Sequence, residues 1–88
     1  MIVNPDYEIV DIANEYMAIP IGNAAKKMHG IVAITETTAY LLRNLSCHRT
    51  IDEMVSLLVS EYGIDEAILR KDVERIVPML LDIGVIIP

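Results

Sequence analysis

The side chains of this sequence that could perform chemistry are a cysteine, two histidines and a few acids. Cys47 and His48 are adjacent, and His29 is the other histidine. Adjacent residues do not share one face of a helix or strand, so this pair suits neither metal ligation nor a cysteine–histidine nucleophile. No Cys-x-x-Cys or His-x-x-x-His spacing occurs. The pattern predicts a half-buried cysteine, a solvated histidine, and neither a metal nor a cofactor.

The acids Glu8, Asp11 and Glu15 are close enough in sequence to suggest a pair of catalytic carboxylates. They lie in or beside the first expected hairpin, and a solvated strand face explains them better. Gly22 and Gly30 do not form a glycine-rich phosphate motif. We therefore expect that the protein is not an enzyme.

Length and composition narrow the range of functions. The chain has 88 residues, of which 53% are hydrophobic, with no Trp, no Phe and four Tyr. These values predict a single domain over residues 1–88, with an aliphatic core and no aromatic platform for single-stranded nucleic acid. The net charge of -6 repels phosphate backbones and is compatible with a basic protein partner. No nucleic-acid partner is expected.

The cysteine count and the hydropathy of the sequence predict where in the cell the protein acts. A single cysteine cannot form an internal disulfide, which a small secreted domain would usually need. The sequence shows no signal peptide and no apolar run of the ~18 residues typical of a transmembrane helix. We expect a cytoplasmic protein without a membrane partner.

The first third of the sequence is typical of strands. Residues 7–12 alternate in part, with Tyr7, Ile9 and Ile12 expected inward, and residues 16–21 form a second apolar run. The intervening residues 13–15 fit a hairpin turn. Pro20 cannot donate to a ladder, so that strand end is expected at a sheet edge or leaving the sheet.

Residues 24–30 are expected to form a loop with one helical turn, and residues 31–34 a third strand. This strand is continuously apolar: Ile31, Val32, Ala33 and Ile34. Such a run indicates either burial on both faces or one face on the core and the other awaiting a partner.

Three helices are expected after the strands. The first begins at Thr35 as N-cap and ends near Asn44, and the second opens with a capping box of Thr50 and Glu53. The third begins after Asp65. Gly63 and Gly84 are expected to end the second and third helices, and Pro78 should kink the third. The apolar stripes are Ala39, Leu42 and Leu45, with Leu41 at the margin; Met54, Val55, Leu58 and Val59; and Leu69, Val73, Ile76, Val77 and Leu80.

This order predicts an α+β fold, a three-stranded antiparallel sheet followed by three α-helices, with the apolar tail 85–87 packing back on the sheet. The turn between the last two helices resembles that of a helix-turn-helix. Beyond its core stripe, the third helix carries Lys71, Arg75 and Met79 at four-residue spacing, beside Asp72. This face is either the lining of a groove or an ordinary amphipathic margin.

Several segments in this order resemble the coenzyme PQQ synthesis protein D (PqqD) family. They are an apolar strand ending in Pro20-Ile21-Gly22, a strand running into Thr35-Glu36-Thr37, and the helix start at 50–55. The turn at 61–65 and the closing segment at 80–86 continue the resemblance over nearly the whole chain.

The resemblance implies a winged helix-turn-helix-like peptide chaperone. Members of this family bind the leader segment of a ribosomally made precursor peptide and present it to a modifying enzyme, often of the radical S-adenosylmethionine type. The leader adds to the third strand and lies against the third helix. The resemblance implies that the strand residues Ile31, Val32, Ala33 and Ile34 bind the peptide. The periodicity of the third helix gives the expected lining on its side, which is Lys71, Asp72, Arg75 and Met79.

Two other functions remain open. One is a winged-helix DNA-binding regulator, which the acids of the third helix disfavour. The other is an oligomerising subunit, in which strand 31–34 pairs with its own copy to form a homodimer.

Overall fold

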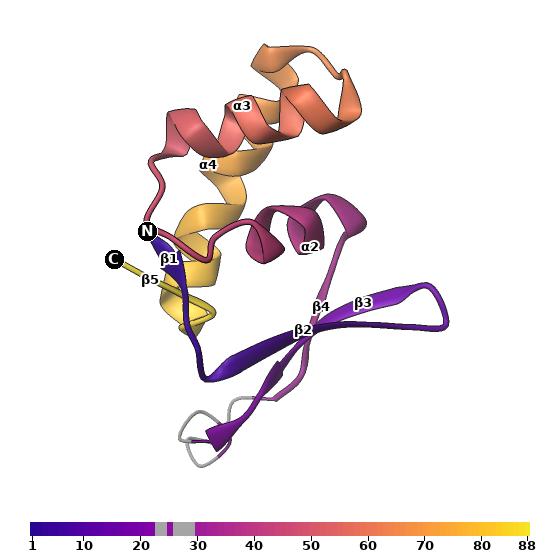
Figure 1. Ribbon diagram of the computed structural model, residues 1–88, viewed down its shortest axis with the longest axis vertical. Helices are drawn as coiled ribbons and strands as arrows, with labels where there is room; N and C mark the ends of the chain where they lie inside the picture. Colours follow the sequence, from indigo (N-terminus) through magenta and orange to yellow (C-terminus); the bar gives the residue numbers. More distant parts are fainter. Residues whose placement is uncertain (23–24, 26–29) are drawn as a thin grey trace.

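The computed structural model describes residues 1–22, 25 and 30–88. Most of the loop expected at 24–30 lies outside the described residues. A three-stranded antiparallel sheet, in the order β2-β3-β4, is followed by three helices (Figure 1). The strands are β2 (Tyr7–Ile12), β3 (Glu15–Pro20) and β4 (Val32–Ile34), and the helices are α2 (Glu36–Arg43), α3 (Ile51–Tyr62) and α4 (Glu66–Ile83). The predicted α+β order is confirmed.

The β2–β3 hairpin turns on two residues. Ala13 and Asn14 have φ values of 54° and 66°, and Ile12 pairs with Glu15. Two positive φ values in a two-residue loop define a type I′ turn, which suits the twist of the strands. The turn is therefore one residue shorter than expected. Ile12 is 57% exposed rather than inward, because strand side chains alternate and it lies on the face opposite Tyr7 and Ile9.

Two further short strands join the ends of the chain. β1 (Ile2–Val3) and β5 (Ile86–Ile87) form an antiparallel sheet of their own, and Figure 1 shows the termini side by side. The Asn4 side chain donates to the carbonyl oxygen of Gly84 over 2.9 Å and strengthens this junction. The tail was expected on the three-stranded sheet, which is wrong. It pairs instead with β1, which is only two residues long and therefore too short to show a strand pattern in the sequence.

Local side-chain contacts set the helix ends, as the sequence predicts. Thr35 accepts from the backbone N–H of Thr38 at the start of α2. Thr50 and Glu53 form the capping box of α3. Gly63 and Gly84 end α3 and α4 with φ values of 65° and 96°, which glycine adopts without steric cost. Pro78 lies inside α4 on its exposed side.

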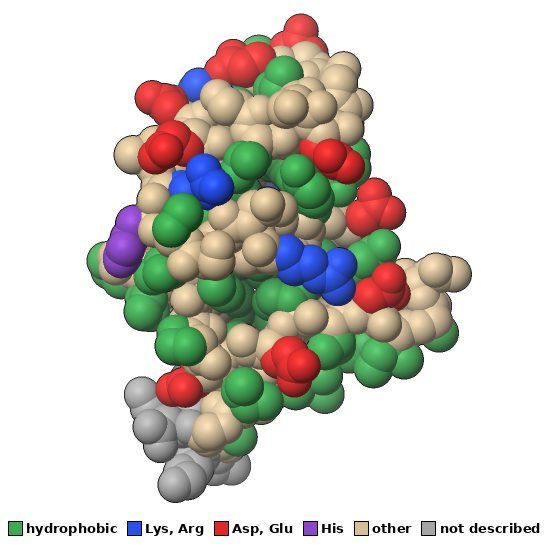
Figure 2. Space-filling view, in the orientation of Figure 1, with side chains coloured by type: hydrophobic (Ala, Val, Ile, Leu, Met, Phe, Trp, Pro, Cys, Tyr) green, Lys and Arg blue, Asp and Glu red, His purple; other side chains and the backbone are tan. Residues whose placement is uncertain are grey.

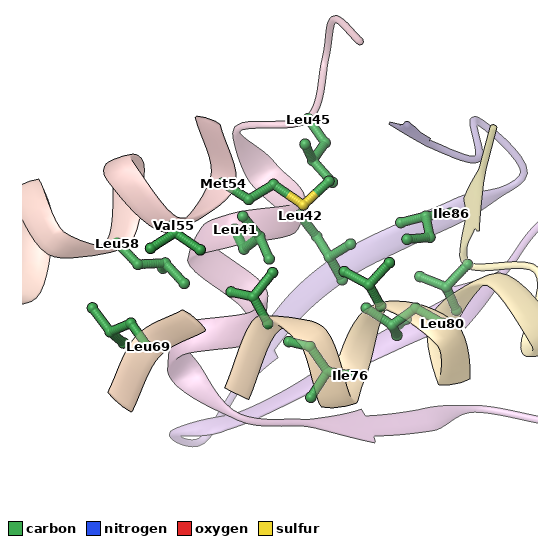
Figure 3. Close-up of a cluster of buried hydrophobic side chains, with 14 of the residues drawn as sticks. Leu41, Leu42, Leu45, Met54, Val55, Leu58, Leu69, Ile76, Leu80 and Ile86 are labelled. Atoms are coloured by element: carbon green, nitrogen blue, oxygen red, sulfur yellow. The ribbon is translucent and has the colours of Figure 1, made fainter. Parts of the chain in front are cut away.

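The core lies where the three helices meet the inner face of the sheet (Figure 3). All five residues of the α4 stripe are buried, as predicted. Leu41 was placed at the margin of α2 but is 1% exposed, because α3 and α4 cover that side of the helix as well. Ala18, on the central strand β3, is fully buried beneath the helices.

Candidate functional site

β4 is an edge strand, and its register determines which of its main-chain groups are free. Ile12 and Glu15 flank the two-residue turn as a hydrogen-bonded pair, and the bond from Ile21 N to Asp6 O fits the same alternation. Every second residue of β3 therefore points its backbone groups at β2. The remaining residues, Tyr16 and Ala18, point theirs at β4.

The same alternation orients β4. Tyr16 is paired with Ile34, and Ala18 with Val32, so the backbone groups of Val32 and Ile34 face β3. Ala33 is paired with Met17 at the intervening position. Its N–H and C=O therefore point away from the sheet. Ala33 is also exposed, so these groups are accessible to another strand.

A groove with a volume of about 480 Å³ lies along the inner side of β4. Its walls come from β4, the beginning of α2 and one side of α4. Val73 and Ile76 belong to the core stripe of α4 and also reach the groove, so its floor is apolar. Six of the residues predicted for a binding site line it: Val32, Ala33, Ile34, Asp72, Arg75 and Met79.

Two predicted residues do not line this groove. Ile31 precedes β4 rather than belonging to it, is 62% exposed, and borders a different hollow. Lys71 is exposed and lies outside the groove lining. Each four-residue step along a helix advances about 40° around its axis, so Lys71 and Met79 do not share one narrow face. Asp72, Arg75 and Met79, at spacings of three and four, form the face that meets the groove.

Helix α2 also contributes to the groove, which no pattern in the sequence indicated. Thr37 and Thr38 line it together with Thr35, the N-cap residue of α2. Leu58 of α3 also reaches it, although it was assigned only to the core. No sequence signal marked these residues, because helix caps and core stripes look the same whether or not a groove borders them.

One cation and one anion lie on the α4 wall of the groove. Arg75 is 3.7 Å from Asp72, and its side chain is 71% exposed. An ion pair this exposed contributes little to the free energy of folding. Arg75 can therefore leave Asp72 and pair with an acidic group of a ligand with little loss of stability. Arg70 is committed elsewhere, because it contacts both Asp52 and Glu66 at 2.6 Å.

A hydrogen bond between Tyr16 and Glu36 lies near Ile34, the last residue of β4. The hydroxyl of Tyr16 donates to Glu36 over 3.4 Å. Partial burial and then the carboxylates of Asp11 and Glu36 raise the pKa of Tyr16. The phenol is therefore neutral at physiological pH and acts as a donor to Glu36.

Residues 1–22, 25 and 30–88 contain no group of three or more His, Cys, Asp or Glu arranged to hold a metal ion. Cys47 is exposed rather than half-buried, because its loop is bonded to the N-terminal segment at Leu45 and Arg49 and leaves residues 46–48 on the surface. His48 is exposed, as expected. None of the helices in these ranges has the length and apolar character needed to cross a bilayer.

The chain was compared with known proteins. The family model described as coenzyme PQQ synthesis protein D (PqqD) matches residues 8–86. Neither the search of curated proteins nor the search of solved structures found a match. The matched range includes β4, α2 and α4, which form the groove.

Proposed function

Because this chain belongs to the PqqD family, we propose that it binds an extended leader peptide by adding it as a strand to β4 and presents it to a modifying enzyme. Members of this family are accessory proteins whose partners are a precursor peptide and a biosynthetic enzyme. The proposal makes the chain a peptide chaperone without catalytic activity, acting in the cytoplasm. The enzyme it serves would be of the radical S-adenosylmethionine type.

The observation that carries this proposal is the free backbone of Ala33 beside an apolar groove. An edge strand offers its N–H and C=O groups to any extended chain, and such main-chain bonds give affinity without selecting a sequence. β4 is short, so the edge alone offers few such bonds. Side-chain contacts in the groove must supply the rest of the affinity.

The pleat of the sheet decides which peptide residues enter the groove. A residue opposite Ala33 places its side chain on the same face as Ala33, away from the helices. Its two neighbours then point inward, beside Val32 and Ile34. This geometry is the same for parallel and antiparallel addition. The groove would receive two aliphatic side chains, above the floor of Val73 and Ile76.

A pair of proline variants tests the docking edge. Binders are selected from a library of short random peptides, and their dissociation constants are measured by fluorescence anisotropy. Ala33→Pro removes an outward N–H from β4. Asp11→Pro is the matched control, since the alternation of β2 and β3 points the Asp11 amide outward at the opposite edge of the sheet.

We expect Ala33→Pro to weaken binding by about tenfold or more, the effect of one lost main-chain bond. Asp11→Pro should bind as the unmodified protein does, and circular dichroism should show that both variants are folded. Equal affinity of the two variants for the selected peptides would contradict the proposal. Sedimentation tests whether two copies of the chain pair at the same edge. A dimer that peptides neither disrupt nor join would also contradict the proposal.

A further inference from the structure

β4 has a second hollow on its outer side, which the proposed peptide groove does not include. Its volume is about 680 Å³, and Met17, Ile31, Ala33 and Ile34 form its aliphatic part. Ala33, with Ile34 and Thr35, lines both hollows. β4 is therefore the wall between them, and a strand added to β4 would border both.

The hollow continues onto the face of the sheet that the helices leave open. Val10, Met17 and Ala33 lie in one cross-strand row on this face. Figure 2 shows hydrophobic side chains along the β2–β3 hairpin on the side away from the helices. A peptide residue opposite Ala33 would extend this row, so its side chain would lie over the outer hollow.

Two carboxylates give the hollow its charge. Glu15 and Glu36 line it, and no Lys or Arg among the described residues does so. Glu36 already accepts from the Tyr16 hydroxyl, which also lines the hollow, whereas no side chain among the described residues pairs with Glu15. A purely aliphatic occupant would cover the Glu15 carboxylate without offering it a partner, which costs free energy. A second copy of the chain would bring further acids, since each chain carries a net charge of -6.

We infer that the outer hollow receives a Lys or Arg side chain of the bound peptide, from the position opposite Ala33. The aliphatic part of that side chain packs on Met17 and Ile31, and its cation reaches Glu15 and Glu36. This inference rests on the proposed function, because it places the peptide on β4. The preferred peptide then alternates two aliphatic residues, facing the groove, with a basic residue between them.

Selection from the random peptide library tests this pattern. Binders of the unmodified protein should share a basic residue between two aliphatic ones. Replacing that residue by Glu in a synthetic binder should weaken binding by about two- to fivefold or more. Glu15→Lys should reverse the preference at this position toward Asp or Glu, and Glu15→Gln should weaken it, because Glu36 remains. Glu8→Lys is the matched control, since Glu8 is exposed on the same outer face of the sheet but does not line the hollow.

The outcomes separate the inference from the proposed function. If Ala33→Pro abolishes binding but the preference survives Glu15→Lys, or no basic preference is seen, the inference is wrong and strand addition stands. If the preference reverses only in Glu15→Lys, both are supported. Peptides that bind Ala33→Pro undiminished, or a selection without any binder, would overturn both. Thermal unfolding of each variant confirms that it is folded.

Discussion

Ala33 lies opposite Met17 between β4 and β3, at a pair whose main-chain groups point away from each other. This relationship makes Ala33, rather than either neighbour in β4, the residue that an added strand would bond. It also places the Ala33 side chain on the open face of the sheet, in the cross-strand row of Val10 and Met17. One cross-strand pair thus links the docking edge to the outer hollow.

Val32→Pro should act on folding, where Ala33→Pro acts on binding. The Val32 amide faces β3 opposite Ala18, so proline there removes a bond within the sheet. We expect Val32→Pro to lower the free energy of unfolding by about 2 kcal/mol or more, and Ala33→Pro by about half of that or less. Urea denaturation followed by circular dichroism measures both, since the chain has no Trp. Equal losses would show that the register of β4 is not the one described.

Arg75→Glu should weaken binding of an acidic peptide. Arg75 lines the groove, and Asp72, at 3.7 Å, is its one ion-pair partner within the described part of the chain. Reversing its charge therefore replaces an attraction to an acidic peptide by a repulsion. The dissociation constant of a selected peptide that contains Asp or Glu should rise roughly tenfold at low salt and less at high salt, where the charges are screened. Lys71→Glu makes the same charge change on α4 outside the groove. If Lys71→Glu weakens binding as much as Arg75→Glu does, Arg75 has no specific part in recognising the peptide.

Glu53 should make the stability of the domain depend on acid. Its carboxylate accepts from the backbone N–H of Thr50 over 2.9 Å, and this bond, followed by the contact with the Thr50 side chain, lowers the pKa of Glu53. A carboxyl with a lower pKa in the folded state stabilises the fold above the ordinary glutamate pKa of about 4.3. That contribution is lost as the pH falls through the lower folded-state value.

Glu53→Gln should therefore unfold with a shallower dependence on pH in this acidic range, measured as the urea midpoint at successive pH values. Glu61→Gln removes the same charge near the other end of α3, away from the cap, and should keep the original slope. If the slope is unchanged in Glu53→Gln, the protonation of Glu53 does not affect the stability of the fold.

Tyr7→Phe should leave the domain as stable or make it more stable. Tyr7 is 6% exposed, and its hydroxyl has no hydrogen-bond partner among residues 1–22, 25 and 30–88. Removing a buried polar group without a partner relieves a cost of about 1 kcal/mol or more. Tyr16→Phe is the comparison, because that hydroxyl donates to Glu36 and its loss should destabilise slightly. A marked loss of stability in Tyr7→Phe, by thermal unfolding, would reveal a partner for this hydroxyl.

The sequence by itself determined the features that depend on neighbours along the chain. Thr35, Thr50 and Asp65 cap helices because their side chains reach backbone N–H groups two or three residues away. Gly63 and Gly84 end helices because they adopt positive φ. The period of apolar residues also identified the buried stripe of α4, and the resemblance to one family covered nearly the range that its model matches.

Tertiary structure decided everything that depends on which surfaces meet. The pairing of β1 with β5 joins residues at opposite ends of the chain, so no local pattern could show it. The outward direction of the Ala33 backbone follows from two registers: the two-residue turn fixes which residues of β3 face β4, and the pairing of β4 with β3 sets Ala33 opposite Met17. The exclusion of Lys71 from the groove and the second hollow on the outer side of β4 depend on how the helices lie on the sheet. Local sequence sets conformation, whereas the accessibility of an edge or a hollow depends on what packs beside it.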